Sequence, residues 1–241
     1  MVKVGLIDSG VAPELSSRVV DSRAFMLDEA GRVEDMAVRP DRLGHGTAIS
    51  RVIAFHAPDV EILNAQVFYS RAVTAPVVVA AALDWLVSRG VQVINMSFGL
   101  RHDRQVLSEA CARAVAAGVV ICAASPARGA AVYPAAYAGV IRTTGDARCA
   151  PHEYSYLNSA QADYGACPRG IVPSAPDTPE AAGASLGTAH MTGIIAARLR
   201  ADWRREDCLE ALQQTATYFG PERKTWPSVR ETAQDDGTYE K

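Results

Sequence analysis

Short apolar runs alternate with longer amphipathic stretches along most of this chain of 241 residues. Runs rich in Val and Ile predict strands that are buried on both faces, whereas stretches with one apolar face predict helices. The predicted strands are residues 2–8, 61–68, 92–97, 119–123 and 139–143. The predicted helices are residues 46–54, 75–89, 104–117, 185–203 and 205–217.

This alternation predicts an α/β fold of three layers, α/β/α, with a mostly parallel central sheet. Residues 1–220 are expected to form one domain. Residues 27–43 and 148–162 show no period and are predicted to be surface loops. The tail, residues 221–241, is expected to be poorly ordered because it has few large apolar residues.

Composition and charge exclude several classes of function. The hydrophobic fraction of 49% and the charged fraction of 21% are those of an ordinary globular protein. A formal net charge of −3 gives no electrostatic reason to expect a nucleic-acid partner. No apolar stretch reaches the length of about 18 residues that would indicate a membrane span. Met1 leads directly into the first predicted strand, so we expect no signal peptide or pro-segment and a cytoplasmic protein.

The five cysteines are odd in number and widely spaced, which favours reduced, buried thiols over disulfides. A cysteine nucleophile is the weaker interpretation, because no cysteine stands at a turn that enters a helix. The sequence contains no Cys-x-x-Cys pair that would indicate a zinc site and no Asp-rich loop that would indicate a calcium site. We therefore expect no metal and no cofactor.

Three polar residues stand in motifs that suggest catalysis. Asp8 ends the first predicted strand, where sites of parallel sheets are found. His45 lies between two glycines before a predicted helix, and Ser185 follows a glycine at the start of another. Asp, His and Ser in this chain order occur in one of the known catalytic triads. In such a triad the imidazole takes the proton of the hydroxyl, and the carboxylate orients the imidazole.

Each of these residues also has a structural interpretation. Asp8 can cap a turn, His45 can simply begin a helix, and the Ser185 hydroxyl can serve as a helix N-cap. Ser174 is an alternative nucleophile, although no helix is predicted directly after it. His190 is interpreted as a packing residue rather than a second catalytic histidine.

Taken together, the motifs resemble those of the subtilisin-like serine proteases. Residues 183–193 resemble the segment that carries the family's nucleophile, and residues 93–99 resemble its substrate-binding strand. Residues 132–137 resemble a Tyr-Pro-Ala segment that contains a cis peptide in the family. The likeness runs from residue 2 to about residue 200. It implies a subtilisin-like fold and a triad of Asp8, His45 and Ser185.

The resemblance also implies where a peptide substrate would lie along the site. Leu100 stands where the family usually has a second glycine, which should narrow the nearby pocket. Phe98 and Leu100 can equally be core residues. The implied substrate-binding residues are Ser97, Phe98, Gly99, Leu100, Ala123 and Ala124.

One departure from the family concerns the oxyanion. The family has an Asn that donates to the oxyanion where this chain has Pro126, which has neither a side-chain donor nor a backbone N–H. The Ser125 hydroxyl and the Ser185 backbone N–H are predicted to serve the oxyanion instead. Asn95 and Asn158 are interpreted as structural residues.

The sequence therefore predicts a serine endopeptidase that acts on a peptide or protein substrate. It also resembles small intracellular proteases that remove a leader from one dedicated partner in maturation operons, such as that of the quinohemoprotein amine dehydrogenase pathway. The alternative is a pseudoprotease that binds a peptide segment without cleaving it, which Pro126 favours. An esterase of the α/β-hydrolase type is disfavoured because no Gly-x-Ser-x-Gly motif occurs.

Overall fold

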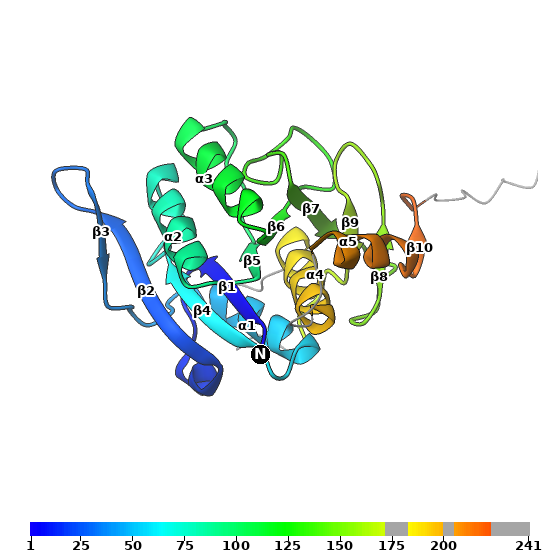
Figure 1. The fold of residues 1–241 in the computed structure, drawn as a ribbon, viewed down its shortest axis with the longest axis horizontal. Helices are drawn as coiled ribbons and strands as arrows, with labels where there is room; N and C mark the ends of the chain where they lie inside the picture. Colours follow the sequence, from blue (N-terminus) through cyan, green and yellow to red (C-terminus); the bar gives the residue numbers. More distant parts are fainter. Residues whose placement is uncertain (172–182, 200–204, 223–241) are drawn as a thin grey trace, which may run out of the picture.

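The computed structural model describes residues 1–171, 183–199 and 205–222, which form three layers around one ten-stranded sheet (Figure 1). The strands are β1 (Lys3–Asp8), β2 (Val19–Leu27), β3 (Val33–Met36), β4 (Glu61–Gln66), β5 (Val93–Met96), β6 (Val120–Ala124), β7 (Val140–Gly145), β8 (Tyr154–Tyr156), β9 (Tyr164–Ala166) and β10 (Tyr218–Phe219). The helices are α1 (His45–His56), α2 (Pro76–Ser88), α3 (Gln105–Ala116), α4 (Ala184–Arg198) and α5 (Arg205–Gln214), with a short 3-10 helix at Pro13–Arg18.

The sheet has the order β10-β8-β9-β7-β6-β5-β1-β4-β2-β3. Its central strands are all parallel, and the antiparallel pairs are β2 with β3 and β8 with β9. Helices α2 and α3 cover one face, whereas α1, α4 and α5 cover the other (Figure 1). The predicted three-layer α/β/α fold is therefore confirmed.

Strand β1 lies in the middle of the sheet and is buried on both faces. Val4 and Leu6 pack with α1 and α4, whereas Ile7 packs with α2 on the opposite side. Alternate residues of a strand point to opposite faces, so a strand covered by helices on both sides needs apolar residues at successive positions. This burial holds Asp8 rigidly at the carboxyl end of β1.

The five predicted strands and five predicted helices are present with shifts of a few residues. Helix α4 ends at Arg198 rather than at residue 203, and residues 200–204 lie outside the described part. The tail predicted at 221–241 falls outside it from residue 223 onward. The predicted cis peptide at Tyr133–Pro134 is confirmed.

Two segments that were predicted to be loops contain strands. Strand β3 lies within residues 27–43, and β8 lies within residues 148–162. In β3 every side chain is exposed or only partly buried, and the strand is held by antiparallel pairing to β2. An edge strand without a buried face has no apolar alternation, so the pattern could not reveal it.

A polar contact joins the two helices that begin at His45 and at Ser185. His190 of α4 is fully buried, and its Nε2–H donates to the Arg169 carbonyl oxygen at 2.9 Å. Its other ring nitrogen, Nδ1, is therefore free to accept from the Nε2–H of His56 in α1, at 2.8 Å. Gly193 lies below His56, and a Cβ there would come within 2.8 Å of the Cβ of His56. This contact supports the structural interpretation of His190.

The histidine pair should make the protein less stable in acid. Burial lowers the pKa of His56 to about 3, helped by the neighbouring His190 and His152, and burial also lowers the pKa of His190. An unfolded histidine titrates near 6.5, so the unfolded chain binds more protons between pH 6.5 and about 3. The free energy of unfolding should therefore fall as the pH falls through this window, by roughly 1.4 kcal/mol per pH unit for each histidine that stays neutral in the folded protein.

Urea denaturation of wild type and His56→Phe between pH 8 and pH 4 tests this slope. His56→Phe should be less stable at pH 8, because His190 Nδ1 loses its donor, but its stability should depend less on pH. His102→Gln is the matched control, since His102 is exposed. An unchanged slope in His56→Phe would contradict the prediction.

Candidate active site

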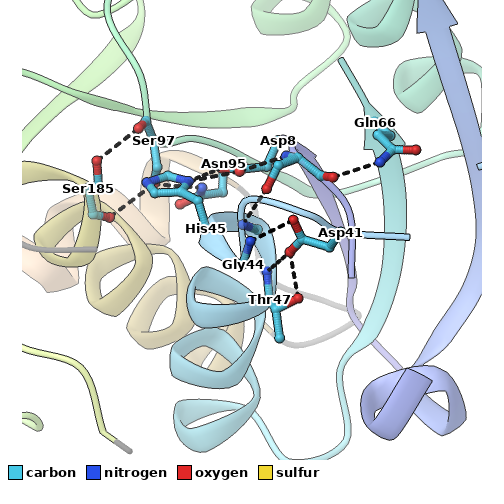
Figure 2. A network of polar contacts seen from close by, with 11 residues as sticks. Asp8, Asp41, Gly44, His45, Thr47, Gln66, Asn95, Ser97 and Ser185 are labelled. Atoms are coloured by element: carbon cyan, nitrogen blue, oxygen red, sulfur yellow. Dashed lines mark hydrogen bonds and ion pairs between the residues drawn. The ribbon is translucent and has the colours of Figure 1, made fainter. Parts of the chain in front are cut away.

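The carboxylate of Asp8 is fully buried at the carboxyl end of β1. Its Oδ1 accepts the Ser9 backbone N–H at 2.7 Å, which fixes the carboxylate group against the following turn. The Ser9 hydroxyl in turn accepts the backbone N–H of Gly46 at 2.9 Å. The end of β1 is therefore joined directly to the first turn of α1 (Figure 2).

Two glycines let the chain bring His45 to this position. Gly44 has a left-handed backbone, with φ 68°, immediately before α1. Gly46 passes so close to the turn after β1 that a Cβ on it would lie 2.2 Å from the carbonyl oxygen of Gly10. Only a residue without a side chain fits at that contact, so the glycines on both sides of His45 have a steric cause.

The His45 ring lies against the Asp8 carboxylate. Its Nδ1–H donates to Asp8 Oδ1 at 2.8 Å and lies 3.0 Å from Oδ2. Burial alone would lower the pKa of His45, but the charge and hydrogen bond of Asp8, together with the charge of Asp41, outweigh it and raise that pKa. The geometry therefore stabilises the imidazolium and leaves Nε2 as the nitrogen available for proton transfer.

Ser185 is the second residue of α4 and is tied to the end of β5. Its Oγ donates to the Ser97 carbonyl oxygen at 2.9 Å, and its own carbonyl oxygen accepts the Ser97 hydroxyl at 2.9 Å. Asn95 Nδ2 donates to the Ser97 hydroxyl at 3.0 Å, and Thr192 Oγ1 donates to Asn95 Oδ1 at 2.9 Å. This network supports the structural interpretation of Asn95, because both ends of its amide are in use.

Figure 2 shows Asp8 bonded to His45, and Ser185 bonded to Ser97 at the end of β5, the strand that pairs with β1. The hydrogen bonds of the described residues do not include one between Ser185 Oγ and His45 Nε2, since Oγ is directed to Ser97. A rotation about χ1 moves a serine hydroxyl between staggered positions at small cost. Hydrogen bonds of catalytic groups are often incomplete before substrate binds.

The two predicted oxyanion donors differ in availability. Ser185 lies in the first turn of α4, where backbone N–H groups lack a partner within the helix. Ser125 is buried, and its hydroxyl donates to the Gln161 carbonyl oxygen at 2.6 Å. The Ser125 hydroxyl must leave that acceptor before it can donate to an oxyanion. Pro126 follows it and supplies no donor.

The predicted substrate-binding residues fall into two groups. Ser97, Phe98, Gly99 and Leu100 leave the end of β5, and a Cβ on Gly99 would meet Val132 at 2.9 Å. The backbone of Leu100 already pairs with Tyr133, through bonds of 2.6 and 2.9 Å.

The second group, Ala123 and Ala124, lies within β6. Ala123 is fully buried between β5 and β7, and Ala124 is also buried. The Ala123 side chain therefore lies inside the sheet, where a substrate cannot contact it. Phe98 is partly buried and packs edge-on against Phe68, with ring centroids 5.3 Å apart.

Sequence reasoning missed Asp41, which organises the start of α1. Its Oδ1 accepts Gly44 N–H at 2.9 Å, and its Oδ2 accepts the backbone N–H and hydroxyl of Thr47 at 3.0 and 2.6 Å. An Asp shortly before a helix is a known capping signal, so the sequence held a clue to this role. Sequence reasoning also missed Gln66, whose buried amide joins Ser9 to Arg39, and no neighbouring residue indicates this role.

The remaining reactive groups do not form a second site within the described residues. All five cysteines are buried, as predicted, and burial raises the pKa of Cys111 and of Cys149 to about 12. Among the described residues, no three His, Cys, Asp or Glu side chains gather closely enough to hold a metal ion. In the same residues, no helix has the length and apolar character needed to cross a bilayer.

The family model described as "Subtilase family" matches residues 1–235. The chain belongs to the subtilase family. Subtilisin DY of Bacillus licheniformis is 30% identical over 156 residues, covering 58% of this subtilase chain and 54% of that protein. The alkaline elastase YaB of Bacillus sp. (strain YaB) is 25% identical over 234 residues, covering 91% and 60%. An intracellular serine protease of Paenibacillus polymyxa is 27% identical over 217 residues, covering 81% and 65%.

This subtilase chain spans between about half and two thirds of the length of these curated relatives. Among solved structures, that of the prenylagaramide maturation protease PagA superposes with a TM-score of 0.58. It is 16% identical, and the match covers 81% of this chain and 74% of that one. The likeness to PagA shows a shared fold.

Proposed function

We propose that this subtilase is a serine endopeptidase with a triad of Asp8, His45 and Ser185. The observation that carries the proposal is the 2.8 Å bond from His45 Nδ1 to the buried Asp8 carboxylate, with Ser185 held by its bonds to Ser97 at the end of the neighbouring strand β5. A buried carboxylate that holds a partly exposed imidazole in one tautomer has little structural use but a clear catalytic one.

Each residue has a defined step in the proposed reaction. Ser185 Oγ attacks the peptide carbonyl carbon while His45 Nε2 takes its proton, and Asp8 stabilises the resulting imidazolium. His45 then protonates the leaving amine, and the C–N bond breaks to leave an acyl-enzyme. A water molecule, deprotonated by His45, then attacks the ester carbonyl carbon. The bond from that carbon to Ser185 Oγ breaks, His45 returns the proton to Oγ, and the second product leaves as a carboxylic acid.

The tetrahedral oxyanion is expected to meet the Ser185 backbone N–H at the positive end of α4. The missing Asn at Pro126 should make the reaction slower than that of a typical family member. Loss of one such donor costs about 10²–10³ in kcat, a magnitude measured on subtilisin itself. Slow turnover is compatible with an enzyme that acts on one dedicated substrate.

A processing role is the finer part of the proposal. The solved neighbour PagA is described as a maturation protease, and one relative as an intracellular serine protease. We infer that this chain removes a leader or similar segment from a peptide or protein substrate inside the cell. Phe98 and Leu100 are partly buried against the core. As predicted substrate-binding residues, they would restrict which side chains of a substrate are accepted.

The second candidate function is a pseudoprotease that holds a peptide without cleaving it. Two observations favour it: Pro126 removes a donor, and the Ser185 hydroxyl donates to Ser97 rather than to His45. The two candidates differ in one measurable property, which is the nucleophilicity of Ser185.

A fluorophosphonate probe followed by intact-mass spectrometry distinguishes them. The protease should gain one adduct per chain in wild type and none in Ser185→Ala, because only a serine with a functioning base reacts with the probe. Circular dichroism should show that both proteins are folded. A folded wild type that stays unmodified after prolonged exposure would exclude the protease and leave the binding function.

A further inference from the structure

A small pocket of about 210 Å³ lies beside the segment that leads to His45. It is lined by Arg39, Pro40, Arg42, Tyr69 and Ser70. Two arginines therefore line one small concave surface together with Tyr69 and Ser70. Arg42 precedes His45 by three residues in the chain.

The backbone beneath Arg39 is held rigidly. Its N–H donates to Gln66 Oε1 at 2.8 Å, and its carbonyl oxygen accepts Gln66 Nε2 at 3.1 Å. Gln66 is fully buried, and the same Nε2 donates to the Ser9 carbonyl oxygen at 2.7 Å (Figure 2). One buried amide thus joins the pocket to the strand end that carries Asp8.

The guanidinium of Arg39 contacts an aromatic ring and two thioether sulfurs, all of them uncharged groups. Its Cζ is 5.3 Å from the centre of the Tyr69 ring, and Nη2 lies 3.9 and 3.7 Å from the sulfur atoms of Met26 and Met36. Thioethers are weak acceptors, so most of its five N–H donors keep their capacity. Stacking on an aromatic ring is a usual way to preorganise an arginine for an anion.

No carboxylate of residues 1–171, 183–199 or 205–222 forms an ion pair with Arg39 or Arg42. Asp41 stands between them in sequence, but both its oxygens are taken by the N-terminus of α1. Elsewhere the chain supplies partners to its structural arginines, as for Arg142 and Asp163 at 2.5 Å. The positive charge of the pocket therefore stays uncompensated within the described residues.

We propose that Arg39 and Arg42 form a subsite that binds a carboxylate of the peptide substrate. The planar fork of a guanidinium matches the two oxygens of a carboxylate, and two such groups beside Tyr69 would hold an acidic side chain or a C-terminal carboxylate. The inference rests on the proposed protease function and assigns the substrate class: a peptide with an acidic group near the scissile bond.

Two quenched-peptide libraries, eight residues long and random except for a fixed Glu or a fixed Gln at one scanned position, test the subsite. Wild type should cleave the Glu library about five- to tenfold faster in kcat/KM at one position, and near-equally at the others. The preference should shrink as NaCl rises from about 50 to 500 mM, because exposed charges are screened. Amidated and free-acid ends of the same peptides separate a side-chain carboxylate from a terminal one.

The double variant Arg39→Gln/Arg42→Gln should lose the preference while it still cleaves the Gln library at the wild-type rate. Arg39→Lys/Arg42→Lys should retain only part of it, because lysine lacks the fork. The matched control Arg89→Gln/Arg113→Gln removes two exposed charges near the C-terminal ends of α2 and α3 and should keep the preference. Equal rates on both libraries in wild type, or an unchanged preference in the Gln double variant, would overturn the proposal.

Failure of the protease function gives a different result from failure of the subsite. If wild type cleaves neither library and resists the fluorophosphonate probe, the proposed function fails. Ser185→Ala immobilised on resin then tests the subsite by retention of the two libraries, quantified by mass spectrometry. Greater retention of the Glu library, abolished in the Arg39→Gln/Arg42→Gln background, supports the subsite, and equal retention contradicts it.

Discussion

Replacing Ser185 by alanine should lower kcat for peptide hydrolysis by about 10⁶-fold, the order measured when the same residue is removed from subtilisin. The hydroxyl is the only group in the proposed reaction that forms the acyl-enzyme, so neither His45 nor Asp8 can replace it. The fold should survive, because the contact that holds Ser97 to α4 uses the Ser185 carbonyl oxygen rather than its side chain. Hydrolysis of a quenched peptide library under single-turnover conditions measures the effect.

Ser174→Ala is the matched control, because Ser174 is the alternative nucleophile suggested by the sequence and lies outside the described residues. It should hydrolyse the library at the wild-type rate. Activity that survives in Ser185→Ala but is lost in Ser174→Ala would refute the assignment of the nucleophile. Thermal unfolding of both variants establishes that any loss is not caused by misfolding.

Replacing Asp8 by asparagine should lower kcat by about 10⁴-fold, the magnitude known for the same exchange in a Ser-His-Asp triad. An amide in place of the carboxylate favours the wrong tautomer of His45 and no longer stabilises the imidazolium. It also changes the pH dependence. In wild type the pKa of His45 is raised above 6.5, so the acid limb of kcat/KM should lie above pH 6.5.

Without the Asp8 charge and hydrogen bond, burial is the largest remaining influence on the pKa of His45, and burial lowers it. The neutral imidazole is the base, so the residual activity of Asp8→Asn should persist to lower pH than that of wild type. Asp84→Asn is the control, since Asp84 lies on α2 and pairs with Arg113. An unshifted acid limb in Asp8→Asn would show that another group controls the titration.

Much of the fold followed from local pattern. Strand β1 is apolar at successive positions because helices cover both faces of the sheet, and that arrangement makes such strands easy to recognise. Helix α1 could be predicted because an amphipathic stretch follows His45, which itself lies between two glycines. Strand β3, by contrast, has no buried face, so its existence depends on pairing with β2 rather than on its own residues.

The candidate site was predictable only in part. Asp8, His45 and Ser185 were found because each stands in a short motif whose neighbours are constrained, as the close approach of Gly46 to Gly10 illustrates. The predicted oxyanion role of Ser125 was inferred without its buried acceptor, Gln161, which lies 36 residues away. Nothing near Ser125 in the chain indicates that contact.

By itself, the sequence determined the order of the five helices and of the strands β1, β4, β5, β6 and β7, and the identity of the three polar residues proposed for catalysis. These properties depend on periodicity and on motifs a few residues long. Only the tertiary structure decided that Gln66 joins Ser9 to Arg39, across separations of 57 and 27 residues. It also decided that Arg39 and Arg42 share one pocket while Asp41 turns inward. Such contacts depend on where distant segments meet in three dimensions, and no local pattern specifies that.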